Sequence, residues 1–548
     1  MKKLHHKNFS SSISKIEYAL IFLFSIFPIF INFPYRINIF LSWEGAYRLY
    51  LGQIPYRDFG LPMGFGYWII PAAFFKLFGP YLISLVKAQA FINIISALAF
   101  RSILKSIRIE PSIRFISILL FLISFSFVNF WPWYNHSVIV FELIGISFLL
   151  KYIFNHRKTR RLLQLFLSSF FIFLAFFTKQ DAGAFALLIG LALVVCKALY
   201  ERKVYPIIWF IAFYLVIALC FILPFIPYHI GYWFNYGQFP HYDRLSLYDI
   251  FDVFFGKSEW IKFYLLIIFL ILIYRFQSDQ FLKDQKFIYN SILTLGILVE
   301  ATVFQVTSYI PEYNNIFFHS FAVSYILSYS GLYTRINLQK WRTLIFTSCL
   351  IILWWSSRPW QYTTRILTRY FPAITQIDTN EVSIRTFSRS ESNAEWDKPQ
   401  DPNLSRWKYS QWKVFKNISM PEKTIEGIKR ITNLPLVKED GPRLKVLNMT
   451  ELTPLAKIIG YVPETGSEIP LWYHKNVAIY EREIKEYENK IQKNYYDIVL
   501  FEYIPILNNF YPFEIRNTLK KDYEQVDEFP GPRRNGYSVI EVYLKKTQ

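Results

Sequence analysis

The chain has 548 residues, carries a formal net charge of +20 at pH 7, and is 53% hydrophobic and 20% aromatic. This apolar share exceeds that of ordinary soluble proteins, and it is concentrated in runs that alternate with short polar breaks between Ile16 and Ser357. All three cysteines lie in these runs, so a disulfide framework is excluded for the rest of the chain, and no Cys/His spacing predicts zinc. Because the basic residues fall largely in the breaks, their charge does not indicate a nucleic-acid partner.

A helix that spans a membrane needs about 20 mostly apolar residues. By this measure the sequence predicts about eleven spans, at 17–34, 81–100, 115–130, 137–153, 162–178, 183–200, 205–227, 260–275, 287–308, 316–333 and 342–357. The first follows a basic segment and lacks a small-residue cleavage site, which predicts a retained helix rather than a signal peptide. A shorter apolar stretch, Phe65 to Phe78, contains Pro71 and is predicted to lie at the membrane interface.

Lys and Arg are distributed unevenly between the breaks, and this predicts the orientation of the chain. One set of breaks is rich in them, at 2–15, 101–114, 151–161, 197–203, 275–286 and 335–342. The short breaks of the alternate set hold only Lys179. Because cytoplasmic loops carry the excess of Lys and Arg, the N-terminus is predicted to be cytoplasmic and the C-terminal region extracytoplasmic. Charges within spans are few, chiefly Glu142 and Glu300, whereas a channel or pump more often places charges in mid-span.

The texture of the sequence changes near Arg358 from apolar to that of a soluble protein. Residues 358–414 are predicted to be a linker or packing segment, and 415–548 a soluble extracytoplasmic domain. Strands are expected at 444–449, 497–501 and 538–544, with a helix at 484–492. The predicted fold is therefore a polytopic α-helical membrane domain over 1–357, with large outer loops at 35–80 and 228–259, followed by an α/β domain.

The first outer loop contains two acids, Glu44 and Asp58, among aromatic residues and prolines. A carboxyl group beside aromatic side chains can have a raised pKa and act as a general base. The alternative is that the two acids only form ion pairs, with Arg48 and Arg57. Local chemistry alone leaves both interpretations open.

The same loop contains three short motifs in a fixed order, which are Glu-Gly-x-Tyr at 44–47, Gly-x-x-Pro-Tyr-Arg-Asp-Phe at 52–59 and Leu-Phe-Gly at 77–79. Their order resembles the first outer loop of GT-C glycosyltransferases. The most similar group comprises the protein O-mannosyltransferases and the lipid A aminoarabinose transferases, membrane enzymes that take a sugar from a polyprenyl-phosphate carrier at the outer face. These enzymes carry an essential acid just after the first helix, often as Asp-Glu. Here Trp43 replaces that Asp, which leaves open whether Glu44 or Asp58 is the key acid and whether the chain is active.

Further stretches fit the same resemblance by their order and side of the membrane. The turn at 177–183 contains Lys179, the turn at 131–136 precedes the fourth span, and 311–315 precedes the tenth. The resemblance implies that Glu44 and Asp58 are catalytic and that Lys179 and Arg57 bind the donor phosphate. It also implies a substrate-binding group, comprising Tyr56, Gln180, Asp181, Asn135, His136 and His319.

Two of these assignments have plainer alternatives. Lys179 has the long stem of a lysine that extends to the membrane interface without binding a ligand. His136 and His319 are more typical of hydrogen-bonded turn residues than of metal ligands, because no ligand spacing links them. No cofactor is predicted with certainty, and a divalent metal ion held by Glu44 or Asp58 with another acid stays open.

The function predicted from the sequence is glycosyl transfer from a polyprenyl-phosphate donor to a lipid, glycan or protein acceptor at the outer face of the cell membrane. The second interpretation is a non-catalytic scaffold for glycan assembly, which the replacement of Asp by Trp43 favours. The third is a transporter of lipid or glycan, for which inverted repeats and paired broken spans are expected.

Overall fold

The computed structural model describes residues 2–35, 39–60, 63–126, 129–154, 158–228, 230–234, 247–277, 283–308, 317–330, 337–356, 407–466, 469–471, 480–505, 511–532 and 538–546. The predicted loop around Arg244, the turn at 309–315 and most of the predicted linker lie outside these residues. The chain divides into two compact units. The first comprises 1–28, 89–223 and 243–366, and the second comprises 29–88, 224–242 and 367–548.

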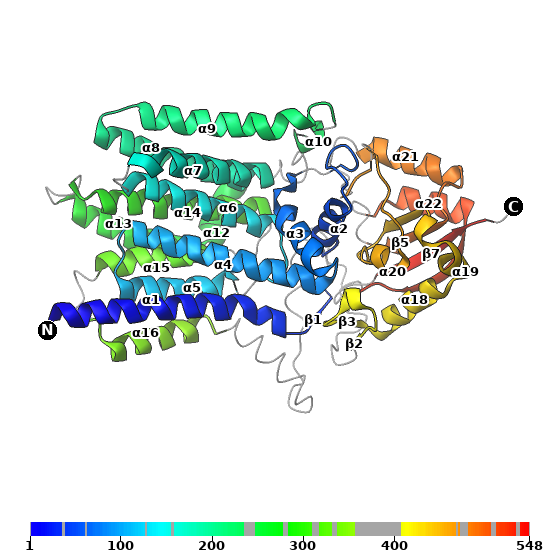
Figure 1. Cartoon of the computed structure of the whole chain (residues 1–548), viewed down its shortest axis with the longest axis horizontal. Coiled ribbons are helices and arrows are strands. Elements are labelled where there is room, and N and C mark those ends of the chain that lie inside the picture. Colours follow the sequence, from blue (N-terminus) through cyan, green and yellow to red (C-terminus); the bar gives the residue numbers. More distant parts are fainter. Residues whose placement is uncertain are drawn as a thin grey trace. The chain divides into compact units, whose positions relative to one another are not determined.

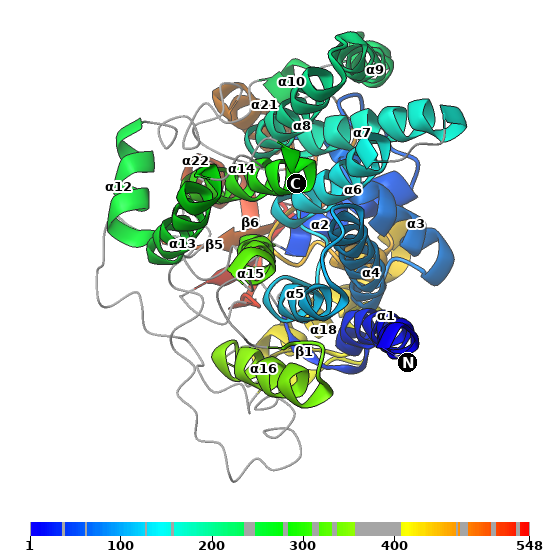
Figure 2. The same cartoon turned by 90° about the vertical axis from the view of Figure 1, so that its left-hand side faces the viewer.

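The first unit is made of helices, most of which run beside one another, whereas the short helix over Leu247–Lys257 lies across them (Figures 1 and 2). They are α1 (Lys2–Ile26), α4 (Leu82–Ser106, which starts in the second unit), α5 (Pro111–Ser124), α6 (Tyr134–Phe154), α7 (Lys158–Thr178), α8 (Gln180–Glu201), α9 (Tyr205–Ile222), α12 (Leu247–Lys257), α13 (Glu259–Phe276), α14 (Gln285–Ser308), α15 (Phe317–Ser330) and α16 (Trp341–Trp354). Each of the predicted spans falls on one of them. Within the described residues, seven helices are long and apolar enough to cross a membrane. The chain is therefore a multi-pass α-helical membrane protein.

The first and third predicted spans differ from their helices by several residues, and a proline lies at one end of each helix. The predicted first span reaches residue 34, but α1 ends at Ile26 and a 3₁₀ helix follows over Phe27–Phe30. Pro28 has no backbone N–H to continue the α-helical hydrogen bonds. The predicted third span, 115–130, is shifted, because α5 begins at Pro111 and ends at Ser124. Proline is favoured in the first helical turn, where its missing N–H has no partner to lose.

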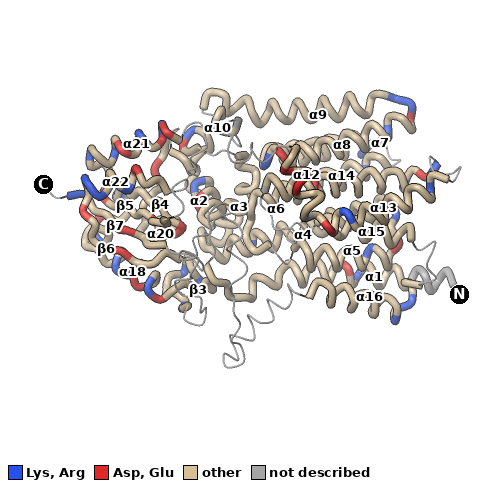
Figure 3. The backbone as a smooth tube through the Cα atoms, turned by 180° about the vertical axis from the view of Figure 1, so that it is seen from behind, with Lys and Arg blue, Asp and Glu red and all other residues tan. Residues whose placement is uncertain are grey.

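A buried ion cluster holds three helices of the first unit together. Glu17 of α1 is fully buried and accepts hydrogen bonds from Arg101 of α4 at 2.7 Å and Arg114 of α5 at 2.8 Å. Figure 3 shows that the Lys and Arg residues of the first unit lie mainly at one end of its helices, the end at which α1 begins.

The second unit contains a four-stranded sheet in the order β4-β5-β7-β6. The strands are β4 (Val446–Met449), β5 (Ile498–Tyr503), β6 (Tyr523–Pro530) and β7 (Val539–Lys545), and β4 is parallel to β5 whereas the other neighbours are antiparallel. The helices of this part are α18 (Glu422–Asn433), α19 (Pro435–Asp440), α20 (Leu455–Ile459), α21 (Tyr480–Gln492) and α22 (Phe513–Asp522). The predicted α/β domain, its three strands and its helix are confirmed.

Apolar side chains of α21 and α22 form one core with the sheet. Ile484 and Tyr487 of α21 and Ile515 of α22 pack in a buried cluster with Val499 and Phe501 of β5. Next to β6, α18 approaches so closely that a Cβ on Gly427 would lie 2.1 Å from the ring of Phe529. Only glycine fits that position without displacing the ring.

The first outer loop folds as part of this second unit. It contains α2 (Ile39–Tyr50), a 3₁₀ helix (Phe65–Trp68) and α3 (Ile69–Phe78), which is the short apolar helix that the sequence predicts. A small sheet places β1 (Phe33–Pro34) parallel to β3 (Ile418–Pro421), with β2 (Trp407–Tyr409) antiparallel on the other side of β3. The segment directly after the first membrane helix is thus a strand of the C-terminal region.

Three backbone hydrogen bonds and one from a side chain tie the loop to the C-terminal region at further points. The N–H of Gly60 donates to Ile469 O at 2.7 Å, and the N–H of Leu471 donates to Gly60 O at 2.9 Å. The N–H of Gly466 donates to Asp58 O at 2.8 Å, and the Tyr35 hydroxyl donates to Glu451 O at 2.6 Å.

Candidate functional site

Helix α2 carries Glu44, and aromatic packing fixes this helix in place. Trp43 is fully buried, donates through Nε1 to Pro80 O at 3.2 Å, and stacks on Tyr47 with ring centroids 4.4 Å apart. A Cβ on Gly45 would lie 1.9 Å from the Trp68 ring, so glycine is required for this approach. At the position where resembling enzymes have Asp, Trp43 is therefore a packing residue, and Glu44 is the acid of that pair.

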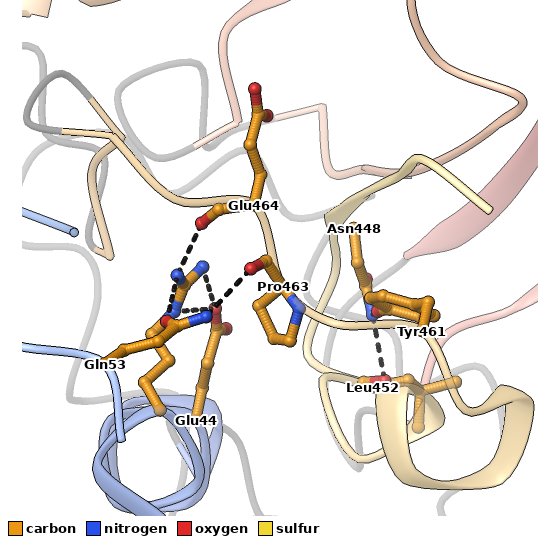
Figure 4. Close-up of polar contacts among 8 residues, drawn as sticks. Glu44, Gln53, Asn448, Leu452, Tyr461, Pro463 and Glu464 are labelled. Carbon is orange, nitrogen blue, oxygen red and sulfur yellow. Dashed lines mark hydrogen bonds and ion pairs between the residues drawn. The ribbon is translucent and has the colours of Figure 1, made fainter. Parts of the chain in front are cut away.

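Arg48, one turn after Glu44, joins α2 to the C-terminal region. Its side chain is 5% exposed, and it donates to the Glu44 carboxylate, to Gln53 Oε1 at 3.0 Å and to Glu464 O at 2.7 Å. The Gln53 amide in turn donates to Pro463 O at 3.0 Å, so two hydrogen bonds join the loop to the segment 461–464 (Figure 4). A guanidinium has five N–H donors in a rigid fork, which suits it to this multiple contact.

Among the residues that the structure describes, only one oxygen of Glu44 accepts hydrogen bonds. Oε1 accepts from both Nε and Nη2 of Arg48, at 2.9 and 2.8 Å. Among the described residues Oε2 has no hydrogen-bond partner, and the side chain is 15% exposed. The predicted ion pair between Glu44 and Arg48 therefore forms, yet it orients the carboxylate and leaves one oxygen for a further contact.

Both oxygens of Asp58 are occupied. Oδ1 accepts from Arg57 Nε at 2.8 Å, and Oδ2 accepts from Arg57 Nη2 and from the Ile54 N–H, each at 2.7 Å. The hydrogen bonds from the Arg57 guanidinium hold the pKa of the Asp58 carboxyl below its ordinary value, against the opposing effect of burial. A carboxylate with a lowered pKa is a weak base near neutral pH, so the geometry of Asp58 suits a turn better than proton transfer.

The neighbours of Asp58 differ sharply in exposure. Tyr56 has a positive φ of 65°, is fully buried, and donates its hydroxyl to Met63 O at 2.8 Å. Burial raises the pKa of that hydroxyl. Arg57 is 44% exposed, so its guanidinium is accessible to an anion from solvent while it holds Asp58.

In the first unit, Lys179 lies between α7 and α8 and is 1% exposed. Its Nζ is 2.6 Å from Asp181 Oδ2 and 4.7 Å from the ring centroid of Phe304. The alternative of a lysine that extends to the interface is therefore wrong, because the ammonium group turns inward to a carboxylate. Gln180, between the two, is half-buried.

Two further acids belong to the same buried region, which the sequence does not indicate. Glu142 of α6 and Glu300 of α14 are both fully buried, and their carboxyl groups influence each other electrostatically, although none of their oxygens has a hydrogen-bond partner among the described residues. Glu300 also interacts electrostatically with Lys179 and Asp181. The sequence shows each of them as a charge within a span, but it does not reveal which helices meet.

The two histidines are hydrogen-bonded residues of different helices in the first unit. His136 Nδ1 lies 3.3 Å from Gln89 Nε2, and its ring stacks on Phe125 at 4.4 Å, while Asn135 precedes it in the first turn of α6. His319 Nδ1 lies 2.9 Å from the Tyr264 hydroxyl. Within the described part of the chain, no group of three His, Cys, Asp or Glu residues is arranged to hold a metal ion.

No family model and no curated protein matches the chain. Among solved structures it is similar to ArnT from Cupriavidus metallidurans in the apo state, at 9% identity, a TM-score of 0.48 and coverage of 97% of this chain and 98% of that one. The same ArnT bound to undecaprenyl phosphate gives 10% identity, a TM-score of 0.48 and coverage of 96% and 97%. An oligosaccharyltransferase from Archaeoglobus fulgidus, in a complex with Zn and sulfate, is similar at 11% identity and a TM-score of 0.36. That match covers 62% of this chain and 52% of the oligosaccharyltransferase.

Because all three TM-scores are below 0.5, these similarities do not establish an activity for this chain. Its function has to be inferred from its own residues.

Proposed function

We propose that this chain is a glycosyltransferase that moves a sugar from a polyprenyl-phosphate donor to an acceptor at the outer face of the membrane. The observation that carries the proposal is the geometry of Glu44. It lies in the loop that resembles the GT-C motif, Arg48 fixes one of its oxygens, and the other has no partner in the described part of the chain. A positioned carboxylate with one available oxygen is the arrangement that a general base needs.

In the proposed reaction the donor supplies its own leaving group. The bond between the sugar carbon and the phosphate oxygen breaks, the acceptor hydroxyl attacks that carbon, and its proton passes to Glu44 Oε2. The products are the glycosylated acceptor and the polyprenyl phosphate. Arg57, which is 44% exposed, is the proposed phosphate ligand, since a guanidinium pairs well with phosphate oxygens as negative charge develops. The direct test is release of polyprenyl phosphate by the purified protein.

For Lys179 the buried pair with Asp181 favours a structural role over binding of the donor phosphate. Lys179→Gln should lower the free energy of unfolding by about 1–3 kcal/mol, the cost of leaving a buried group without its partner. The double variant Lys179→Gln with Asp181→Asn should recover part of that loss and should keep the donor affinity of the wild type. Thermal unfolding and a donor titration measure the two effects. A double variant that is stable but no longer binds donor would return Lys179 to the role of phosphate ligand.

The proposed reaction requires the second unit to lie outside the cytoplasm. The basic residues at one end of the first-unit helices support this orientation (Figure 3). A reporter enzyme that is active only in the cytoplasm should therefore be silent when it is fused after Gln548 and active when it is fused before Met1. The opposite pattern would place Glu44 on the cytoplasmic side and contradict transfer at the outer face.

A further inference from the structure

The second unit contains an open cavity of about 440 Å³ on the side of its C-terminal region. The residues that line it come from the start of α4, the turn before β3, and the helices α18, α19 and α20. They are Tyr81, Trp412, Lys413, Val414, Thr432, Val437, Lys457, Ile458 and Ile459. Its size falls within the range of about 300–1,000 Å³ that is typical of small-molecule sites.

The cavity has two aromatic residues in its wall, Tyr81 and Trp412, and local packing holds the ring of Tyr81. Gly79 has a φ of 86°, and a Cβ there would lie 2.5 Å from the Tyr81 ring, so the ring packs against bare backbone. Lys413 Nζ lies 4.8 Å from the centroid of the same ring. Trp412 precedes a 3₁₀ turn, Lys413–Phe415, in which the Phe415 N–H donates to Trp412 O at 3.0 Å. Trp412 is only half-buried.

Charge and polarity complete the lining. Val414, Val437 and Ile459 are buried and form apolar surface. Lys413 and Lys457 are exposed, and no Asp or Glu is among the residues that line the cavity. The charge on its lining is therefore positive only.

From this combination we propose that the cavity binds an anionic sugar unit of the acceptor, such as a uronic acid or a phosphorylated hexose. An indole face offers apolar and π contact to the C–H face of a sugar ring, while an ammonium group at the rim pairs with a carboxylate or phosphate. An inorganic anion would leave the aromatic wall uncovered, and a neutral sugar would leave the lysines without an anion. That the bound sugar belongs to the acceptor rests on the proposed transferase function. Binding of an anionic sugar in the cavity does not depend on that function.

The test is calorimetric titration of the full-length protein in detergent with methyl glucuronoside, and separately with methyl glucoside and inorganic phosphate. Methyl glucuronoside should bind, and its affinity should fall as salt rises. Lys457→Gln should weaken it about tenfold or more, the usual loss of a charge-assisted hydrogen bond. The matched control is Lys438→Gln, which changes an exposed lysine of α19 outside the lining. Trp412→Leu should lower the affinity for methyl glucuronoside and also any residual affinity for methyl glucoside.

Four results would overturn the proposal. They are no binding of methyl glucuronoside, equal affinity for methyl glucoside, equal affinity for inorganic phosphate, and binding that neither Lys457→Gln nor Trp412→Leu changes. The transferase proposal and the cavity proposal can fail independently. If the protein binds methyl glucuronoside but releases no polyprenyl phosphate from donor, the transferase proposal fails and the cavity stands as a glycan-binding site. If it transfers sugar but does not bind methyl glucuronoside, the cavity proposal fails alone.

Discussion

Replacing Glu44 by Gln should lower the rate of sugar transfer by about 10²–10⁴-fold, the usual cost of removing a positioned general base. The amide has the shape of the carboxylate, and its oxygen can still accept from Arg48, so the fold of the loop should persist. What the variant loses is the ability of the second oxygen to take a proton. The measurement is the initial rate of transfer at saturating donor, with thermal unfolding as the check that the protein is intact.

Asp58→Asn is the matched control for this change. Both oxygens of Asp58 already accept hydrogen bonds, from Arg57 and from the Ile54 N–H. Its loss should disturb the turn and lower the rate by a smaller factor than Glu44→Gln. If instead Asp58→Asn abolishes transfer while Glu44→Gln keeps a near-normal rate, Asp58 is the key acid and the assignment made from the free oxygen of Glu44 is wrong.

Arg48→Met should be the most destabilising single change in the first outer loop, at about 3–5 kcal/mol. The substitution removes a buried cation and leaves Glu44, Gln53 Oε1 and Glu464 O without their donor. Because the last of these contacts joins α2 to the segment 461–464, amide hydrogen exchange in that segment should increase. A shift in the thermal midpoint and this local increase are the two readouts.

The comparison for Arg48 is Arg57→Met, which breaks an ion pair whose arginine is 44% exposed. Exposed pairs contribute about 0–1 kcal/mol, so its thermal midpoint should hardly change. Adding Glu44→Gln to Arg48→Met should recover part of the lost stability, since the uncompensated carboxylate is then gone, but it should not recover transfer. Equal midpoints for Arg48→Met and the wild type would show that the contacts of Arg48 do not hold the unit together.

The sequence predicts those features that depend on local pattern. Runs of apolar residues place every predicted span on a helix. Short apolar runs locate β4 and β5, and alternation of apolar and polar residues locates β7. The strand β6 escapes prediction because its central residues, Glu524 to Glu528, are polar except for Val526 and are largely exposed. The spacing of Glu44 and Arg48, one helical turn apart, also predicts their ion pair correctly.

Contacts between distant segments are what the sequence does not predict. Nothing in residues 33–60 indicates that they pair with β3 or with Ile469, because backbone hydrogen bonds leave no signature in side-chain periodicity. The same holds for Glu142 and Glu300, each of which reads as an isolated charge within its own span. The free oxygen of Glu44 and the occupied oxygens of Asp58 likewise depend on three-dimensional geometry, although both acids stand out in the sequence.

The most direct test of the proposed function is donor turnover by the purified full-length protein. The donor is the lipid-linked sugar fraction of the membranes in which the protein occurs. When this fraction is incubated with the wild type and a cell-envelope acceptor fraction, it should yield free polyprenyl phosphate and glycosylated acceptor in equal amounts. The same incubation with Glu44→Gln should yield neither above background. Donor that stays intact with the wild type, or that is consumed equally with Glu44→Gln, would contradict a transferase that uses Glu44 as its base.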